Sequence, residues 1–110
     1  MPESEKQYVI GMDCGTSNMK AIILDNTGEV LAEESRPVTS INLGNGAVEQ
    51  NPDEWWKNAV SIFRGLMRKI GENRKERVSA LAISSHTVTM LPLDENKRPL
   101  RNALTCQDGR

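Results

Sequence analysis

The stretch from residue 10 to residue 20, IGMDCGTSNMK, most constrains how this chain can fold. It puts an acid, a glycine, two hydroxyl residues and a lysine between two apolar runs, YVI before it and AIIL after it. Short apolar runs bounded by turn residues are typical of buried strands. The sequence therefore predicts strands at 8–12 and 21–24, joined by a tight polar turn with no helix between them.

The residue types in this turn are suited to binding phosphate. A sharp turn at Gly15 exposes backbone N–H groups that suit anionic oxygens, and glycine tolerates the positive φ that such turns use. Thr16 and Ser17 add hydroxyl donors, and Lys20 adds a positive charge. Asp13 fits if Mg²⁺ is included, because a carboxylate can hold this ion beside phosphate, often through water. The turn is a candidate cradle for nucleotide phosphates, and a plain β-turn is the alternative that these residues leave open.

The rest of the chain predicts one more hairpin strand, one long helix and further strands. The predicted elements are a strand at 29–34 that forms a hairpin with the strand before it, a loop at 38–50, a helix at 52–70, and strands at 78–84, 88–93 and, in part, 99–105. No internal repeat interrupts this order. The pattern indicates an α/β domain.

The helix carries the strongest local signals. Asn51 suits the N-cap, Glu54 three residues later allows a capping-box variant, and Gly71 suits the position after the last turn. Apolar residues recur at helical spacing along about four turns. Trp55 and Trp56 are part of this pattern, and we expect both to anchor the core.

Composition narrows the function classes. The 110 residues are 37% hydrophobic and 26% charged with a net charge of -1, which suits one soluble domain and gives no overall attraction to nucleic acid or anionic membranes. Residues 1–7 read as a disordered tail and lack the apolar segment of a secretion signal. Cys14 and Cys106 have no zinc-type spacing, so free thiols in a reducing cytoplasm are expected.

Several stretches follow one another in an order that carries a family resemblance. They are DCGTSNMK with its hairpin AIILDNTGEVLAE, then VEQNPDEWW, then VSALAISSHTVTMLPLDENKRPLRNALTCQDGR. In order and spacing they resemble the blocks D-x-G-T-[TS]-x-x-[KR], E-x-[DN]-P-x-x-[WL]-W and A-I-x-W-x-D-x-R of the FGGY carbohydrate kinases, members of the actin–hexokinase–Hsp70 superfamily. The resemblance covers nearly the whole chain from Tyr8.

The resemblance implies a fold and a nucleotide site. The fold would be a ribonuclease-H-like α/β fragment, with a mixed sheet whose first three strands are antiparallel and with one packed helix, and 8–110 would be part of the amino-terminal domain of a sugar kinase. The cofactors would be ATP and Mg²⁺. The residues that would face them are Asp13, Gly15, Thr16, Ser17 and Lys20, with Asp13 as the metal ligand.

The resemblance also implies an acceptor site. Ser85, His86, Thr87 and Val88 would line the sugar site, and Asp108 would orient the sugar. A pentulose such as xylulose is the first expectation, because the N-Q-R-E stretch that glycerol kinases place in this loop is not matched. Cys106 stands where the final block has tryptophan, so the pocket wall differs.

Family members are several hundred residues long, which sets the expectation for this chain alone. Their catalytic base lies beyond the position of Arg110, so no catalytic residue is assigned here and the fragment alone is expected to be inactive. The partners implied are a small sugar and ATP, with no nucleic acid and no membrane, and a homodimer of the full-length enzyme remains open. The competing hypothesis is a non-catalytic partner-binding module or an inert fragment.

Overall fold

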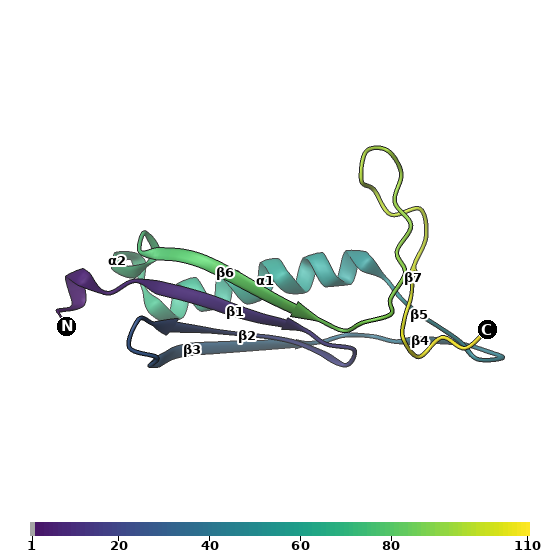
Figure 1. Cartoon of the computed structure of the whole chain (residues 1–110), viewed down its shortest axis with the longest axis horizontal. Helices are drawn as coiled ribbons and strands as arrows, with labels where there is room; N and C mark the ends of the chain where they lie inside the picture. The colour runs from purple at the N-terminus through teal and green to yellow at the C-terminus, as the bar shows by residue number, and fades with distance from the viewer. Residues whose placement is uncertain (1) are drawn as a thin grey trace.

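The chain builds a mixed four-stranded sheet in this computed structural model, which describes residues 2–110 (Figure 1). Its strands are β1 (Tyr8–Cys14), β2 (Asn18–Asp25), β3 (Val30–Pro37) and β6 (Val78–Ser85), in the spatial order β3-β2-β1-β6. The first three strands pair antiparallel, and β6 runs parallel to β1. The predicted mixed sheet is therefore confirmed.

A second, smaller sheet lies at the other end of the molecule. It consists of β4 (Ile41–Gly44), β5 (Ala47–Gln50) and β7 (Ala103–Leu104), in that spatial order. The loop predicted over 38–50 is therefore wrong. The Asn-Gly pair at 45–46 takes positive φ at both residues, 53° and 78°, and this is the two-residue hairpin turn that such a pair favours.

Helix α1 (Pro52–Ile70) begins and ends where its caps predict. The Asn51 side chain accepts a hydrogen bond from the amide two residues later, and Gly71 follows the helix with a φ of 86°. The capping box does not form, because the Glu54 carboxylate accepts from the amide and hydroxyl of Thr39 instead, at 2.6 and 2.8 Å. Glu54 thus ties the helix start to the chain that leaves β3.

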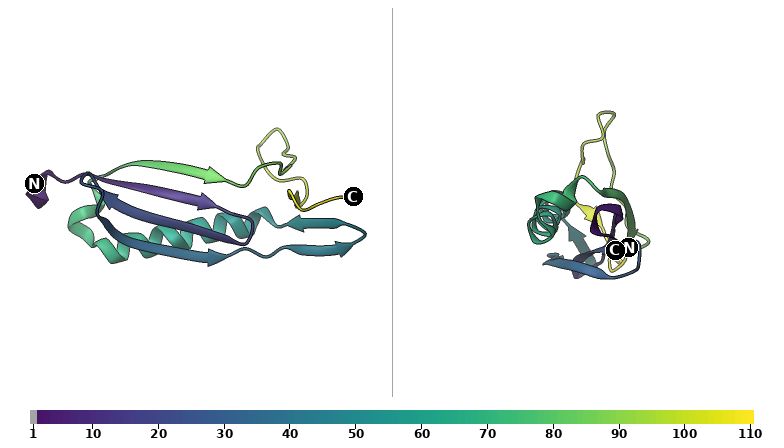
Figure 2. Two further views of the ribbon diagram at one scale, coloured as in Figure 1. Left: turned by 60° about the horizontal axis from the view of Figure 1, so that its bottom comes forward. Right: turned by 90° about the vertical axis from the view of Figure 1, so that its left-hand side faces the viewer.

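Helix α1 covers one face of the four-stranded sheet, as the end-on view in Figure 2 shows. A single turn, α2 (Glu72–Lys75), follows it, and no helix within residues 2–110 is long and apolar enough to cross a membrane. The buried residues between helix and sheet include Tyr8, Ile10, Met12, Met19, Ala21, Ile23, Ile62, Leu66 and Ile70. Trp55 packs against this core, but Trp56 is 73% exposed, so its predicted core role is wrong.

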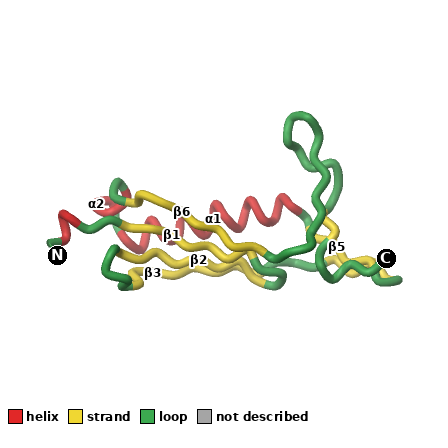
Figure 3. Tube along the Cα trace, viewed as in Figure 1, coloured by secondary structure: helices red, strands yellow, loops and turns green. Residues whose placement is uncertain are grey.

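The segment between β6 and β7 projects from the body of the domain as a long loop (Figures 1 and 3). The strand predicted over 88–93 is wrong, since only Met90 there pairs with β7, at Leu104, and as an isolated bridge. Val88 has a φ of 56°, which interrupts an extended backbone, and a proline within 88–93 removes a donor. The strand expected in part over 99–105 is reduced to the two residues of β7.

The amino-terminal segment lies against the domain. Residues 1–7 were predicted to be disordered, but the described part contains a 3-10 turn, η1 (Glu3–Glu5), and Met1 lies outside the described residues. The Glu3 carboxylate accepts hydrogen bonds from the Tyr8 hydroxyl and from Arg74. The contact with Arg74 is charged and links residues far apart in sequence, and together the two contacts order a segment whose own composition predicts no structure.

Strand β6 is an edge with exposed apolar side chains. In the part of the chain that the structure describes, it has a neighbouring strand on one side only. Leu81 and Ile83 are 47% and 61% exposed, because the helix packs over β2 and β3 rather than over β6. Apolar edges of this kind favour pairing with a further strand.

The packing of α1 on the sheet can be tested at Leu66, which is fully buried. We expect Leu66→Ala to lower the free energy of unfolding by about 2–5 kcal/mol, because the deletion leaves a cavity in the core. Chemical denaturation measures this. Arg68→Ala, on the exposed side of the same helix, should change it by less than about 0.5 kcal/mol. Equal losses in the two variants would contradict this packing.

Candidate functional site

The β1–β2 turn is sharp because a glycine allows its two sides to approach closely. The Gly15 amide donates to the Asn18 carbonyl at 2.9 Å, and a Cβ on Gly15 would lie 2.8 Å from that oxygen. Gly15 is not among the residues with positive φ, so that part of the sequence prediction is wrong. Close approach of the backbone, rather than a left-handed conformation, is the reason for glycine at this position.

The turn is held through its carbonyl groups. The Thr16 carbonyl accepts from the Gln50 side-chain amide, and the Ser17 carbonyl accepts from the Val38 amide, each at 2.9 Å. Within residues 2–110, the amides of Thr16 and Ser17 donate no hydrogen bond to protein. Two adjacent backbone donors are thus left for a ligand, which is the arrangement that binds anionic oxygens.

Asp13 and Lys20 lie side by side on the sheet face opposite α1. They are directly paired across β1 and β2, both are exposed, and Asp13 also pairs with Ser84 of β6. All three line a shallow hollow of about 440 Å³. One acid and one base are therefore placed at the end of the sheet where the turn begins.

The residues near the turn fit a magnesium ion that would be held mainly by water and by substrate phosphates. No three potential metal-binding side chains gather anywhere in the described part of the chain, so Asp13 would have to hold a metal ion without two further such side chains. Mg²⁺ commonly keeps several waters and uses one or two carboxylates together with substrate phosphates. An exposed Asp13 beside free backbone donors is consistent with that mode of binding.

A separate cavity of about 330 Å³ lies where β1 and β6 end near the start of α1. Its lining includes Cys14, Gly15, Trp55, Ser85, His86 and Thr89. Ser85 and His86 of the predicted sugar site thus lie together with Gly15 of the turn. Thr87, Val88 and Asp108 do not line this cavity, and the Val88 side chain is 85% exposed.

His86 is fixed in this wall by contacts with two residues. Its amide donates to the Cys14 carbonyl at 3.0 Å, and its Nδ1 lies at the same distance from that oxygen. A carbonyl only accepts, so Nδ1 carries the proton in this contact and Nε2 is left for another partner. The ring meets the Trp55 indole edge-on, with centroids 5.9 Å apart. Burial raises the pKa of the Cys14 thiol, which makes it a poor nucleophile.

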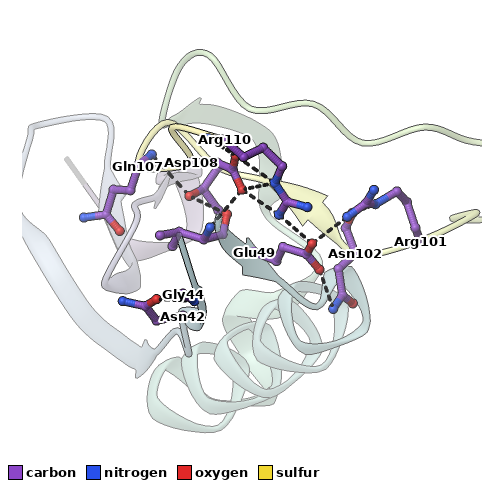
Figure 4. A network of polar contacts seen from close by, with 10 residues as sticks. Asn42, Gly44, Glu49, Arg101, Asn102, Gln107, Asp108 and Arg110 are labelled. Atoms are coloured by element: carbon purple, nitrogen blue, oxygen red, sulfur yellow. Dashed lines mark hydrogen bonds and ion pairs between the residues drawn. The ribbon is translucent and has the colours of Figure 1, made fainter. Parts of the chain in front are cut away.

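Asp108 lies in a different set of contacts, drawn in Figure 4. Its Oδ2 accepts from the Val48 amide at 2.8 Å and from the Arg110 guanidinium at 2.7 Å. Arg110 also donates to Glu49 at 2.6 Å, and Arg101 donates to Glu49 at 2.5 Å. The hydrogen bond from Arg110 is the main reason that the pKa of Asp108 is lowered to about 2. This carboxylate fastens the end of the chain to β5.

Glu49 and Gln50 are not among the site residues that the sequence predicts. Both are buried, and both make side-chain hydrogen bonds to distant parts of the chain. The signal was present in the block VEQNPDEWW, where they stand directly before the helix cap. The loop predicted over 38–50 implies that these two residues are exposed, because loops usually lie on the surface.

Comparison with known proteins decides the family. The sequence pattern of the FGGY family of carbohydrate kinases, N-terminal domain, matches residues 8–110. This chain belongs to that family. The chain is 32% identical to the xylulose kinase of Bacillus subtilis over 104 residues, and 34% identical to a glycerol kinase of Koribacter versatilis over 104 residues. Each match covers 94% of this chain and 21% of the relative, so the chain spans about a fifth of these FGGY proteins.

Solved FGGY kinases share the fold described above. The xylulose kinase from Rhodospirillum rubrum superimposes with a TM-score of 0.88 at 31% identity, covering 94% of this chain and 22% of that one. The gluconate kinase from Lactobacillus acidophilus gives a TM-score of 0.85 at 27% identity, covering 94% and 20%. The predicted ribonuclease-H-like class of the actin–hexokinase–Hsp70 superfamily is confirmed by these neighbours.

The role of Asp108 in anchoring the chain end can be tested by pH. The folded pKa of Asp108 is about 2, below its usual 3.8, so its stabilising effect is complete above the higher value and is lost as pH falls toward the lower one. We expect the thermal unfolding midpoint of the wild type to drop more steeply over this range than that of Asp108→Asn. Parallel pH profiles for the two proteins would contradict the structural role.

Proposed function

We propose that this chain is part of an ATP-dependent carbohydrate kinase that transfers the γ-phosphoryl group of ATP to a hydroxyl of a sugar or polyol. The observation that carries the proposal is the β1–β2 turn, whose carbonyls are bonded and whose Thr16 and Ser17 amides are free. The family membership supports the same reaction class. The parent protein, rather than this chain alone, would perform the complete reaction.

Phosphoryl transfer depends mostly on positioning and on charge stabilisation. The free backbone amides of Thr16 and Ser17 would bind phosphate oxygens at the turn that Gly15 makes possible. The Ser17 hydroxyl would add a donor, as would the Thr16 hydroxyl, which lies 3.9 Å from the Cys106 sulfur. Lys20, which is exposed on the neighbouring strand, would offset their charge. Asp13 would hold Mg²⁺, which when bound neutralises charge on the phosphates.

The acceptor would occupy the cavity between the turn and the end of β6. His86 Nε2, the Ser85 hydroxyl and the Thr89 hydroxyl, which is buried without a hydrogen-bond partner among residues 2–110, are groups there that can bond a substrate hydroxyl. The similar proteins include both xylulose kinases and glycerol kinases. We propose a pentulose such as xylulose, because the N-Q-R-E stretch of glycerol kinases is missing. Asp108 is left out of the direct contacts, since its carboxylate is already bonded, and Thr87 and Val88 would act only at the rim.

The proposal includes three further expectations for the whole protein. The base that removes the proton from the attacking hydroxyl is not among these 110 residues, so the chain alone would show no turnover. The enzyme would work in the cytoplasm, and a homodimer is its proposed assembly. A non-catalytic partner-binding module is the competing function, supported by the exposed Leu81 and Ile83 on β6.

The test is a coupled assay of ADP release by the complete protein, with D-xylulose, D-ribulose, D-gluconate and glycerol as acceptors. We expect turnover that requires one of these acceptors, greatest with a pentulose, and none from the chain by itself. Turnover by the isolated chain would contradict the assignment of the base to another part of the protein. A complete protein that binds no Mg-ATP would contradict the kinase proposal.

A matched pair of lysine variants shows whether the turn region binds the nucleotide. Lys20→Met should raise the KM for ATP about tenfold or more, because it removes a charge that contacts phosphate. Lys57→Met, at an exposed position on the helix that faces away from the turn, should leave that KM unchanged. Equal effects of the two substitutions would show that overall charge, rather than the site, was responsible.

A further inference from the structure

Gln50 is a buried amide whose two ends are bonded to two different functional regions. Its side chain is fully buried. Its Nε2 donates to the Thr16 carbonyl at 2.9 Å and to the Ser40 hydroxyl at 3.2 Å. Its Oε1 accepts from the indole Nε1 of Trp55 at 2.9 Å. Both ends of the amide are therefore used, and neither is solvated.

One end of Gln50 holds the phosphate turn. The Thr16 carbonyl that it binds belongs to the peptide group whose N–H lies on Ser17, so fixing this oxygen fixes the direction of that amide. Among residues 2–110, the other carbonyl of Thr16 and Ser17 is held in the same way, by the Val38 amide, which donates to the Ser17 carbonyl. Loss of the Gln50 bond would let the free amides rotate away from a common ligand.

The other end of Gln50 holds the wall of the acceptor cavity. Trp55 lines that cavity and meets the His86 ring edge-on. Because the indole N–H is bonded to Gln50, any movement of the indole that an acceptor causes must alter this bond or move the amide. A continuous chain of contacts therefore runs from Thr16 through Gln50 and Trp55 to His86.

We propose that Gln50 is a positioning residue that couples occupancy of the acceptor cavity to nucleotide affinity. This inference rests on the proposed kinase function. An acceptor that fixes the positions of Trp55 and His86 also fixes Gln50 and strengthens its hydrogen bond to the Thr16 carbonyl. The pre-ordered turn then binds phosphate more tightly. Such coupling is reciprocal, so bound nucleotide raises the affinity for the acceptor by the same factor.

The experiment compares nucleotide affinity with and without acceptor in the complete protein. Equilibrium binding of ADP with Mg²⁺ is measured in buffer and in saturating D-xylulose, and the ratio of the two dissociation constants is the readout. We expect D-xylulose to tighten ADP at least about fivefold in the wild type. Gln50→Met keeps the side-chain length and removes all its hydrogen bonds, so the ratio should fall to about one.

Two further variants separate coupling from folding. Trp55→Phe removes the indole N–H together with one of the two fused rings and keeps an aromatic ring in the wall beside His86, so the ratio should also fall to about one. Ser40→Ala removes the weaker contact of Gln50 and keeps the Thr16 and Trp55 bonds, so it should retain the wild-type ratio. If Gln50→Met does not fold, Trp55→Phe decides the question. A purely structural role would lower stability and leave the ratio intact.

The outcomes distinguish the two proposals. A wild-type protein that binds no Mg-ADP overturns the kinase function and this inference with it. A wild type that binds ADP with a ratio of one, or variants of Gln50 and Trp55 that keep the wild-type ratio, overturn the coupling alone and leave the kinase function standing.

Discussion

The hydrogen bonds to the carbonyl side of the β1–β2 turn are the interactions on which the rest of the site depends. A turn bonded only within itself would point its amides according to local preference. Here the Thr16 carbonyl is bonded to Gln50 and the Ser17 carbonyl to Val38, which come from parts of the chain beyond the first hairpin. Two donors are thereby held in place without being used. Preorganised donors of this kind stabilise charge without reorganisation during a reaction.

Distant parts of the chain hold this turn in position. Asp108 and Arg110 fasten the chain end to β5 through Val48 and Glu49, and β7 pairs with the same strand. Strand β5 in turn ends at Gln50, directly before the helix cap. The smaller sheet therefore positions the amide that holds the turn, while α1 and the larger sheet supply the rigid body beneath it. The layered core and the polar network have separate roles.

Much of this arrangement could be predicted from local signals. The strands around the turn, the β2–β3 hairpin and the helix caps follow from short stretches whose residues prefer one conformation. The β4–β5 hairpin also has a local signal, the pair Asn45-Gly46, but this pair stands among other residues that favour loops. The sequence correctly places a glycine-dependent turn at Gly15 but attributes the need for glycine to a positive φ. In the structure the reason is the close approach to Asn18.

The remaining features depend on contacts that no local pattern shows. The contact of Asp108 with Val48 and that of Arg110 with Glu49 join residues about 60 positions apart, so no local pattern predicts that Asp108 anchors this segment. Trp56 follows the apolar spacing of the helix but lies on its exposed side, where the sheet does not reach. Gln50 could be placed only once β5 was known to be a buried strand.

A nuclear magnetic resonance titration of the backbone amides with Mg-ATP shows whether the turn binds phosphate. We expect large, saturable shifts of the Thr16 and Ser17 amide signals as phosphate oxygens accept from them. The Gly15 amide, already bonded to Asn18, should move much less. Thr16 and Ser17 signals that stay in place while the protein is saturated with nucleotide would contradict the central claim.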